Sequence, residues 1–267
     1  MTAKVNPAGA QKITRLLVAG DPEPVNVANG GARGPCVIVC DHAGRATPQA
    51  LGRLGLPEAA FERHIAWDIG AGAVSLLLGE ALDAPVVRQA YSRLVIDCNR
   101  APGRSDAIVE ISDGIAVPGN RGLSPADVEA RIAEVHAPYH QRIAEVLDRQ
   151  AAAGAGGVIL SVHSFTPRMN GHDRPWRFGV LHESDSPLSD AMLAALREDE
   201  TAPVGDNEPY AMDGIDYTVP LHARTRGMDY LEIEIRQDLI ADPAGQAEIA
   251  QSLARAFSRA LARLGAG

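Results

Sequence analysis

The sequence predicts an α/β fold in which helices cover both faces of a mixed, mainly parallel sheet. Short apolar runs of strand length recur along the chain, and longer stretches with apolar side chains at helical spacing separate most of them. Strands that alternate with helices are typical of such sheets. The 267 residues, 46% of them hydrophobic, suffice for one large core. We therefore expect a single α/β domain over residues 35–267, preceded by a loosely attached N-terminal arm over residues 1–34.

The charge and the cysteines restrict the expected partners and compartment. The formal net charge is -9 and the basic residues are scattered, which argues against a nucleic-acid or anionic-membrane surface and favours small polar partners. Cys36, Cys40 and Cys98 lie in apolar runs without CxxC spacing, so we expect buried reduced thiols and a cytoplasmic protein. No run approaches the roughly 20 apolar residues of a membrane span, and no signal peptide is recognisable. The oligomeric state is not predicted.

The first predicted strand, residues 35–40, is a buried apolar run that stops abruptly at Asp41 and His42. Helical structure, in one or two pieces, is predicted from about 57 to 82, because apolar side chains recur there at helical spacing. His64 and Asp68 are four residues apart, so on that helix they would share one face.

Two further strands are predicted at residues 85–91 and 93–100, the second ending in charged and amide side chains. Residues 101–122 are rich in Pro, Gly, Asp and Asn, and a loop of this length in a compact domain is often functional. Ser124 followed by Pro125 then indicates the start of a helix that reaches about residue 153.

The second half of the chain continues the alternation. We predict strands at 157–167, 176–183 and 230–239, helices at 188–200 and 243–264, and a turn-rich segment at 205–227.

Two predicted strands deliver a histidine to the same kind of position, His42 and His163. In open α/β sheets, sites form at the carboxyl ends of strands, and imidazole is the commonest zinc ligand. A catalytic zinc typically takes three protein ligands and keeps one position open. We choose Asp68 as the third ligand; the alternatives left open are His64, Asp41 and Asp97.

A pair of carboxylates is predicted on one face of the strand at 230–239. Alternation places Glu232 and Glu234 together, and burying both is costly unless they are paired or functional. A carboxylate beside a zinc-bound water is the usual general base for amide hydrolysis, which is the role we expect for Glu234. The alternative is an ion pair between Glu234 and Arg236.

Polar residues outside the metal set are candidates for binding substrate. Arg93, Asn99 and Arg100 cluster at a predicted strand end, and because the arginine fork binds carboxylates bidentately, they are expected to anchor an acidic substrate. His222 and the loop that contains Asn207 are expected to line the same pocket. The sequence contains no GxSxG motif, which argues against a serine hydrolase.

Several of these stretches together resemble the N-formylglutamate amidohydrolase family, over about residues 22–264. The stretches that carry the resemblance are VIVCDHAG, HIAWDIGA, YSRLVIDCNR, SVHSFTP, GDNEPY and LEIEIRQDL. The wider relatives are the zinc carboxypeptidases and aspartoacylases, so the resemblance implies a three-layer αβα fold of the phosphorylase/hydrolase type with one zinc ion. It also implies hydrolysis of the linear amide of a small, carboxylate-bearing N-acyl amino acid, most simply N-formylglutamate.

The resemblance assigns roles residue by residue. His42 and His163 match the two histidine ligands, and Glu234 resembles the general base. Asn99 and Arg100 resemble residues that hold the substrate carboxylate, whereas Arg93 resembles an arginine that polarises the scissile carbonyl.

The HxxE spacing of many zinc peptidases is absent, since Arg45 stands three residues after His42. This departure leaves the carboxylate ligand unassigned by motif. It motivates one alternative, a metal-binding member of the fold without catalysis or with another specificity. A carboxypeptidase-like peptidase is a further alternative.

Overall fold

The computed structural model describes residues 15–199, 202–212 and 214–265. Its centre is a seven-stranded sheet in the order β1-β3-β2-β6-β11-β9-β10. The strands are β1 (Val25–Ala28), β2 (Cys36–Cys40), β3 (Val86–Gln89), β6 (Val158–Phe165), β9 (Phe178–Leu181), β10 (Val204–Asp206) and β11 (Asp229–Arg236). The predicted strands at 35–40, 85–91, 157–167, 176–183 and 230–239 are therefore confirmed.

The sheet is mixed and mainly parallel, as expected. The central strands β3, β2, β6 and β11 run parallel to one another. β1 pairs antiparallel with β3, and β9, with β10 parallel beside it, pairs antiparallel with β11. Because β2, β6 and β11 are neighbours that run in one direction, side chains at their carboxyl ends meet at one edge of the sheet.

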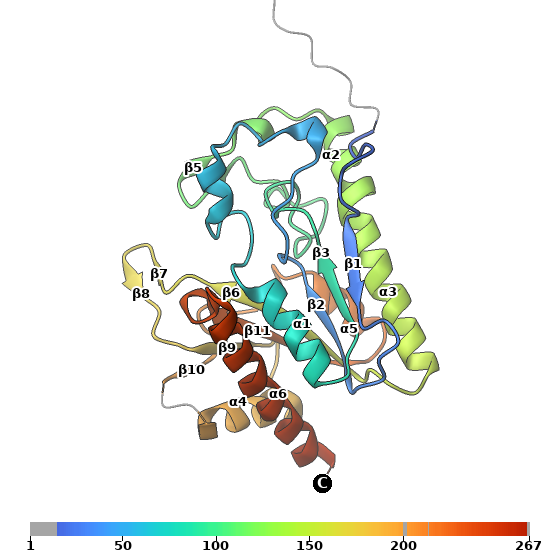
Figure 1. Cartoon of the computed structure of the whole chain (residues 1–267), viewed down its shortest axis with the longest axis vertical. Helices are drawn as coiled ribbons and strands as arrows, with labels where there is room; N and C mark the ends of the chain where they lie inside the picture. The colour runs from blue at the N-terminus through green and yellow to red at the C-terminus, as the bar shows by residue number, and fades with distance from the viewer. Residues whose placement is uncertain (1–14, 200–201, 213, 266–267) are drawn as a thin grey trace, which may run out of the picture.

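Helices cover both faces and form three layers. One face carries α1 (Ala71–Ala81), α4 (Pro187–Asp199) and α6 (Pro243–Gly265), and the other carries α3 (Ala137–Ala152) and α5 (Thr218–Arg224). Figure 1 shows α1 and α6 side by side over the sheet. Successive side chains of β2 point to opposite faces of the sheet. Ile38 packs in the cluster with α1 and α6, and Val39 packs in the cluster with α3. A short 3-10 helix, η5 (Gln237–Ile240), links β11 to α6.

A third apolar cluster lies in a loop-rich cap beyond the sheet. Its buried members include Phe61, Leu94 and Ile96. The cap contains the 3-10 helices η1 (Gln49–Leu51), η2 (Glu58–Glu62) and η3 (Pro118–Asn120) and a hairpin of β4 (Ile111–Ser112) and β5 (Ile115–Ala116). Figure 1 shows these segments at the end of the molecule opposite the C-terminus, with a second hairpin, β7 (Arg168–Met169) and β8 (His172–Asp173), projecting at one side.

The predicted helix after Ser124 forms, but in three pieces. α2 (Pro125–Arg131) begins with a capping box between Ser124 and Asp127. A π-helical segment, Ile132–His136, follows before α3. Pro138 accounts for this irregular turn, because its ring carries no N–H and would clash with the carbonyl four residues earlier in a regular helix.

The helical segment predicted over 57–82, in one or two pieces, forms as two pieces, and the stretch between them that includes His64 and Asp68 is not helical. Only η2 and α1 are helical, and residues 63–70 form turns. Gly70 has φ +80°, and a Cβ there would lie 2.3 Å from the Ile240 carbonyl oxygen, so the chain turns sharply before α1. Asp68 therefore lies in a turn, where its backbone N–H donates to the His42 carbonyl (2.9 Å). This bond holds Asp68 beside the end of β2.

The strand predicted at 93–100 is also wrong, since these residues form turns. Backbone carbonyl groups of this segment accept hydrogen bonds from side chains, where a strand would bond to a neighbouring strand. Arg131 Nη1 donates to the Val95 carbonyl (2.9 Å), and Asn120 Nδ2 donates to the Leu94 carbonyl (2.9 Å). A buried apolar run can thus be a loop when polar side chains from elsewhere meet its hydrogen-bonding needs.

Two other segments contain regular structure that the sequence does not predict. β1 lies inside the predicted N-terminal arm, as the edge strand of the sheet, whereas residues 1–14 of that arm lie outside the described residues. α5 lies inside the segment predicted to be turns, 205–227. No helix among the described residues is both long and apolar enough to cross a membrane.

Candidate metal centre and active site

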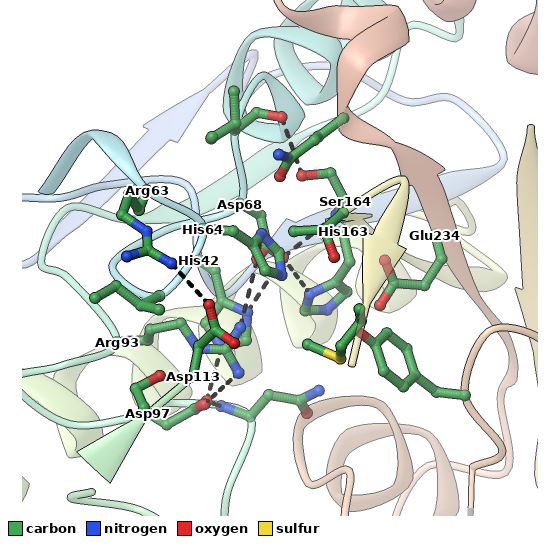
Figure 2. A pocket seen from close by; sticks show the side chains of 18 of the residues that line it. His42, Arg63, His64, Asp68, Arg93, Asp97, Asp113, His163, Ser164 and Glu234 are labelled. Carbon is green, nitrogen blue, oxygen red and sulfur yellow. Dashed lines mark hydrogen bonds and ion pairs between the residues drawn. The ribbon is translucent and has the colours of Figure 1, made fainter. Parts of the chain in front are cut away.

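Three side chains converge at the carboxyl edge of the central strands. His42 follows β2, His163 lies in β6, and Asp68 lies in the turn before α1. Figure 2 shows them directed toward one another in a cavity. One ligand atom from each lies within 4.8 Å of the other two, and all three residues are buried. Among the described residues this is the one His, Cys, Asp or Glu group arranged to hold a metal ion.

A buried carboxylate orients each imidazole from the side away from Asp68. His42 Nε2 lies 2.7 Å from Asp97 Oδ1, and its Nδ1 lies 3.3 Å from Asp68 Oδ2. His163 Nε2 lies 3.0 Å from Ser161 Oγ and 3.2 Å from Asp41 Oδ2, and its Nδ1 lies 2.9 Å from Asp68 Oδ2. Metal-binding histidines usually donate their second ring N–H to such a carboxylate. The set of two Nδ1 atoms and one carboxylate oxygen could therefore hold a metal ion, with Asp97 and Asp41 behind the two imidazoles.

The remaining alternative ligand, His64, borders this group. Its Nδ1 lies 3.6 Å from Asp68 Oδ1 and has no hydrogen-bond partner within the described residues. Burial lowers the pKa of His64 to about 4, so the imidazole is neutral near pH 7. Arg45 lies outside the site, where its guanidinium is 5.1 Å from the Trp67 ring and pairs with Glu62.

The charges around the triad favour a bound cation. Burial opposes the ionisation of Asp68, but the neighbouring histidines outweigh it and hold the pKa of Asp68 well below its usual range. Burial also opposes protonation of His163, yet Glu232, Asp41 and Asp68 outweigh it and raise the pKa of His163 well above its ordinary value. Ionised carboxylates thus surround the imidazoles, and a proton or a metal ion is the natural counter-charge.

Glu234 lies beside the triad on the neighbouring strand. It is opposite His163 in the β11–β6 register, and Figure 2 shows its carboxylate at the cavity next to that histidine. The residue is 6% exposed, and its Oε2 has no hydrogen-bond partner within the described residues. Burial raises the pKa of Glu234 to about 8. The alternative ion pair with Arg236 does not form, because Arg236 Nε bonds Asp238 (2.8 Å).

Glu232 lies on the same face of β11, opposite Ser161 of β6. It is 2% exposed, and its Oε2 also has no partner within the described residues. Burial raises the pKa of Glu232 well above its ordinary value, and repulsion by Asp216 and Glu234 adds to this effect. Asp216, which precedes α5 and lines the same cavity, carries no signal in the sequence that points to the site.

The predicted cluster of Arg93, Asn99 and Arg100 lines the cavity. Arg93 Nη2 donates to Asp97 Oδ2 (2.8 Å), and its Nη1 lies 3.5 Å from Asp68 Oδ1. Asn99 Nδ2 and Arg100 Nη1 are directed at Asp216 Oδ1, at 3.0 and 3.5 Å. The cluster therefore forms, but with a carboxylate of the protein itself as its partner.

His222 and Asn207 are not among the residues that line the cavity. His222 Nε2 lies 3.1 Å from His140 Nδ1, and the two rings stack with centroids 5.4 Å apart. Asn207 Oδ1 accepts the backbone N–H of His182 (2.9 Å). Both side chains serve the fold, so the geometry gives no support to their expected contact with substrate.

The cavity has a volume of about 820 Å³ and draws its walls from distant parts of the chain. Its rim includes an ion pair between Arg63 and Asp113 (2.8 Å), which joins the segment before α1 to the β4–β5 hairpin. Sequence patterns did not identify these rim residues, because they lie in loops without periodicity and meet only in the folded cap.

Comparison with known proteins identifies the family. The model of the N-formylglutamate amidohydrolase family matches residues 34–241, which is more than half of the chain. The chain belongs to the N-formylglutamate amidohydrolase family. The family description supports an amide-cleaving hydrolase.

Two solved structures of similar proteins extend over nearly the whole chain. The crystal structure of gene product Atu2144 from Agrobacterium tumefaciens is 40% identical, covers 94% of this chain and 100% of its own, and has a TM-score of 0.90. N-formylglutamate amidohydrolase from Ralstonia eutropha JMP134 is 21% identical, covers 91% of this chain and 100% of its own, and has a TM-score of 0.66, a likeness that shows the fold. The comparison with curated proteins gives no match.

Proposed function

We propose that this chain is a zinc-dependent amidohydrolase that cleaves the linear amide of an N-acyl amino acid, most simply an N-formyl amino acid such as N-formylglutamate. One observation carries the proposal: an unpaired, buried Glu234 faces the same cavity as the convergent group His42, Asp68 and His163. Membership of the N-formylglutamate amidohydrolase family supports amide cleavage. The catalytic unit is the α/β domain over residues 35–267, extended by β1.

His42, His163 and Asp68 are the proposed ligands, and a zinc ion held there would act as a Lewis acid on water and on the substrate carbonyl. Asp97 and Asp41 keep the two imidazoles in the orientation that presents Nδ1 to the metal.

Glu234 is the proposed general base and acid. It takes a proton from the water whose oxygen forms a bond to the acyl carbon, and it returns the proton to the nitrogen as the C–N bond breaks. The products are a carboxylic acid, formic acid for a formyl group, and a free amine. Burial with Oε2 unpartnered suits this role, because that oxygen can accept a proton without giving up a hydrogen bond to another described residue.

Arg93 is the proposed electrophilic residue at the acyl oxygen. Its contacts with Asp97 and Asp68 hold the guanidinium at the cavity wall next to the ligands. A fixed cation in this position stabilises negative charge that develops on the carbonyl oxygen. Arg100 lies on the same wall and is the proposed contact for the amino-acid portion, whereas Asn99 is bonded to Asp216 and to the backbone of residues 217 and 218 and positions this wall.

Buried, unpaired thiols support a reducing compartment. Cys36, Cys40 and Cys98 are all free and buried, so we propose a cytoplasmic enzyme with a small-molecule substrate.

The test combines metal content with substrate hydrolysis. Protein purified without chelators is assayed for zinc, and formate release is measured for a panel of N-formyl amino acids, N-formylglutamate included, before and after chelation and zinc return. About one zinc per chain with release that chelation abolishes supports the proposal. Bound metal without release from any N-formyl or N-acetyl amino acid indicates a non-catalytic metal-binding protein, and cleavage of dipeptides alone indicates a carboxypeptidase. A chain that binds no metal contradicts the mechanism.

A further inference from the structure

The cavity of this protein carries more negative than positive side chains. Eight carboxylates and four arginines line it. All four arginines already contact a carboxylate of the protein: Arg63 with Asp113 at 2.8 Å, Arg93 with Asp97 at 2.8 Å, Arg100 with Asp106 and Asp216 at 3.5 Å, and Arg168 with Asp173 at 3.6 Å. Each of these arginines therefore has a carboxylate partner within the protein, so none is left to bind the side-chain carboxylate of a glutamate derivative in addition to the α-carboxylate that every N-acyl amino acid carries.

Asp216 fills the place where a substrate carboxylate was expected. Its Oδ1 accepts from Asn99 Nδ2 (3.0 Å) and lies 3.5 Å from Arg100 Nη1. The position is fixed, because Asn99 Oδ1 also accepts the backbone N–H groups of Tyr217 (2.9 Å) and Thr218 (3.0 Å) at the start of α5. Asn99 thus ties the segment 216–218 to the cavity wall and keeps the Asp216 carboxylate there.

Glu232 adds a second carboxylate to the same part of the cavity. It is 2% exposed, lines the cavity, and has an Oε2 without a hydrogen-bond partner within the described residues. Its neighbour in the sheet register on β9 is Leu181, which also lines the cavity, so a ligand reaching this depth meets one apolar side chain and two carboxylates. Burial raises the pKa of Glu232, repulsion by Asp216 adds to this effect, and His163 compensates only part of it, so a cation bound between the two carboxylates would be stabilised by both.

We infer that Asp216 and Glu232 form an acidic subsite that binds a positively charged nitrogen of the substrate. The inference rests on the proposed amide hydrolysis but replaces N-formylglutamate as its simplest substrate: the scissile amide belongs to an N-acyl derivative of a basic amino acid, with an aliphatic stem against Leu181 and an ammonium group between the two carboxylates. A glutamate side chain in this subsite would instead bring a third carboxylate to Asp216 and Glu232. A second metal ion is not the occupant that the geometry favours, since the triad is the one group of suitable ligands in the described part of the chain.

The first test measures binding by calorimetry, so that it does not depend on turnover. The zinc-loaded Glu234→Gln chain is titrated with N-formyl-L-lysine, its uncharged analogue N-formyl-L-norleucine, and N-formyl-L-glutamate. We expect the lysine derivative to bind at least about tenfold more tightly than the norleucine derivative, and the glutamate derivative to bind most weakly. Equal affinities, or tightest binding of the glutamate derivative, would overturn the inference.

The second test removes the negative charges one at a time. Adding Glu232→Gln or Asp216→Asn to the same background should reduce the lysine-to-norleucine affinity ratio about tenfold each. The matched control is Glu248→Gln, an exposed acid outside the cavity that pairs with Arg177, which should keep the ratio. A ratio that none of the variants changes contradicts the subsite.

Turnover by the unsubstituted enzyme separates the two proposals. Hydrolysis of N-formylglutamate in preference to the lysine derivative would refute the acidic subsite and leave the amidohydrolase intact. Tight, Glu232-dependent binding of the lysine derivative without any hydrolysis would refute the proposed function and leave the subsite intact.

Discussion

Glu234 on β11 lies directly opposite His163 on β6 in a parallel register. The two residues come from strands that are neighbours in the sheet but 71 positions apart in the chain. Strand alternation turns Ile233 and Ile235 into the core beneath α1 and α6, so Glu234 must point to the other face, where the cavity lies. The sheet itself therefore sets the position of the proposed general base relative to a proposed metal ligand.

The change Glu234→Gln should abolish hydrolysis and leave the zinc bound. The amide keeps the size of the side chain but cannot accept a proton from water, and loss of a general base typically costs about 10²- to 10⁴-fold in rate. Formate release and zinc per chain are measured on the same preparation. Glu248→Gln, on the surface of α6, is the matched control and should retain the full rate. Turnover by Glu234→Gln within a few-fold of the unsubstituted enzyme would show that another group accepts the proton.

The change Asp41→Asn should weaken zinc binding without unfolding the chain. Asp41 Oδ2 contacts His163 Nε2 at 3.2 Å, and its Oδ1 accepts from Thr218 Oγ1 (2.7 Å). The asparagine can still accept from Thr218, but it loses the charge that orients and polarises the imidazole. Loss of such a partner typically costs about 10- to 100-fold in metal affinity. Competition against a chromophoric chelator measures the zinc Kd, and an unchanged Kd would mean that Asp41 does not support this ligand.

How much of the site the sequence predicts depends on how each residue is positioned. His42, His163 and Glu234 lie at or near the ends of apolar strands, and period-2 alternation with parallel packing suffices to bring such residues together. Asp68, the carboxylate chosen from the sequence, does lie in the group that could hold a metal ion, but the predicted helix is not what places it there. It reaches the site from a turn held to His42 by a backbone hydrogen bond, and not from a helix face shared with His64.

The cap and the acidic side of the cavity could not be predicted from local patterns. Residues 93–100 have the composition of a buried strand, yet they form turns because Arg131 and Asn120 supply the hydrogen bonds that a neighbouring strand would give. Asp216 meets Asn99 from 117 residues away, and no periodicity links two loop residues over that separation. Long-range side-chain hydrogen bonds, and not secondary-structure propensity, determine this part of the fold.

The change Arg131→Met should destabilise the protein strongly. Arg131 is 1% exposed, and its guanidinium donates to the Val95 carbonyl (2.9 Å), to Asn120 Oδ1 (2.7 Å) and to the Gly119 carbonyl (3.2 Å). Methionine fills similar space but leaves these acceptors unpaired, at about 1 to 3 kcal/mol each, so we expect a loss of about 3 kcal/mol or more in the free energy of unfolding. Urea unfolding measures it.

Arg142→Met is the control for this prediction. Arg142 is an exposed arginine on α3 that pairs with Glu145, and its loss should cost less than about 1 kcal/mol. Equal effects of the two substitutions would show that the buried hydrogen bonds of Arg131 contribute nothing beyond those of a surface ion pair.

Stability should fall as the pH is lowered from about 6.5 toward 4, in part through the buried pair His140 and His222. Burial lowers the pKa of His140 to about 3 and that of His222 to about 4, with His136 and Arg226 adding to the effect and Asp41 opposing it. In this window the unfolded chain binds protons on both imidazoles and the folded chain does not. The free energy of unfolding therefore decreases with falling pH, by up to about 1.4 kcal/mol per pH unit for each histidine. Urea unfolding at pH 6 and 5 measures the dependence of the free energy of unfolding on pH. His222→Gln should reduce this slope by the contribution of about one proton taken up on unfolding. A variant with the same slope as the unsubstituted protein would show that His222 is protonated equally in both states.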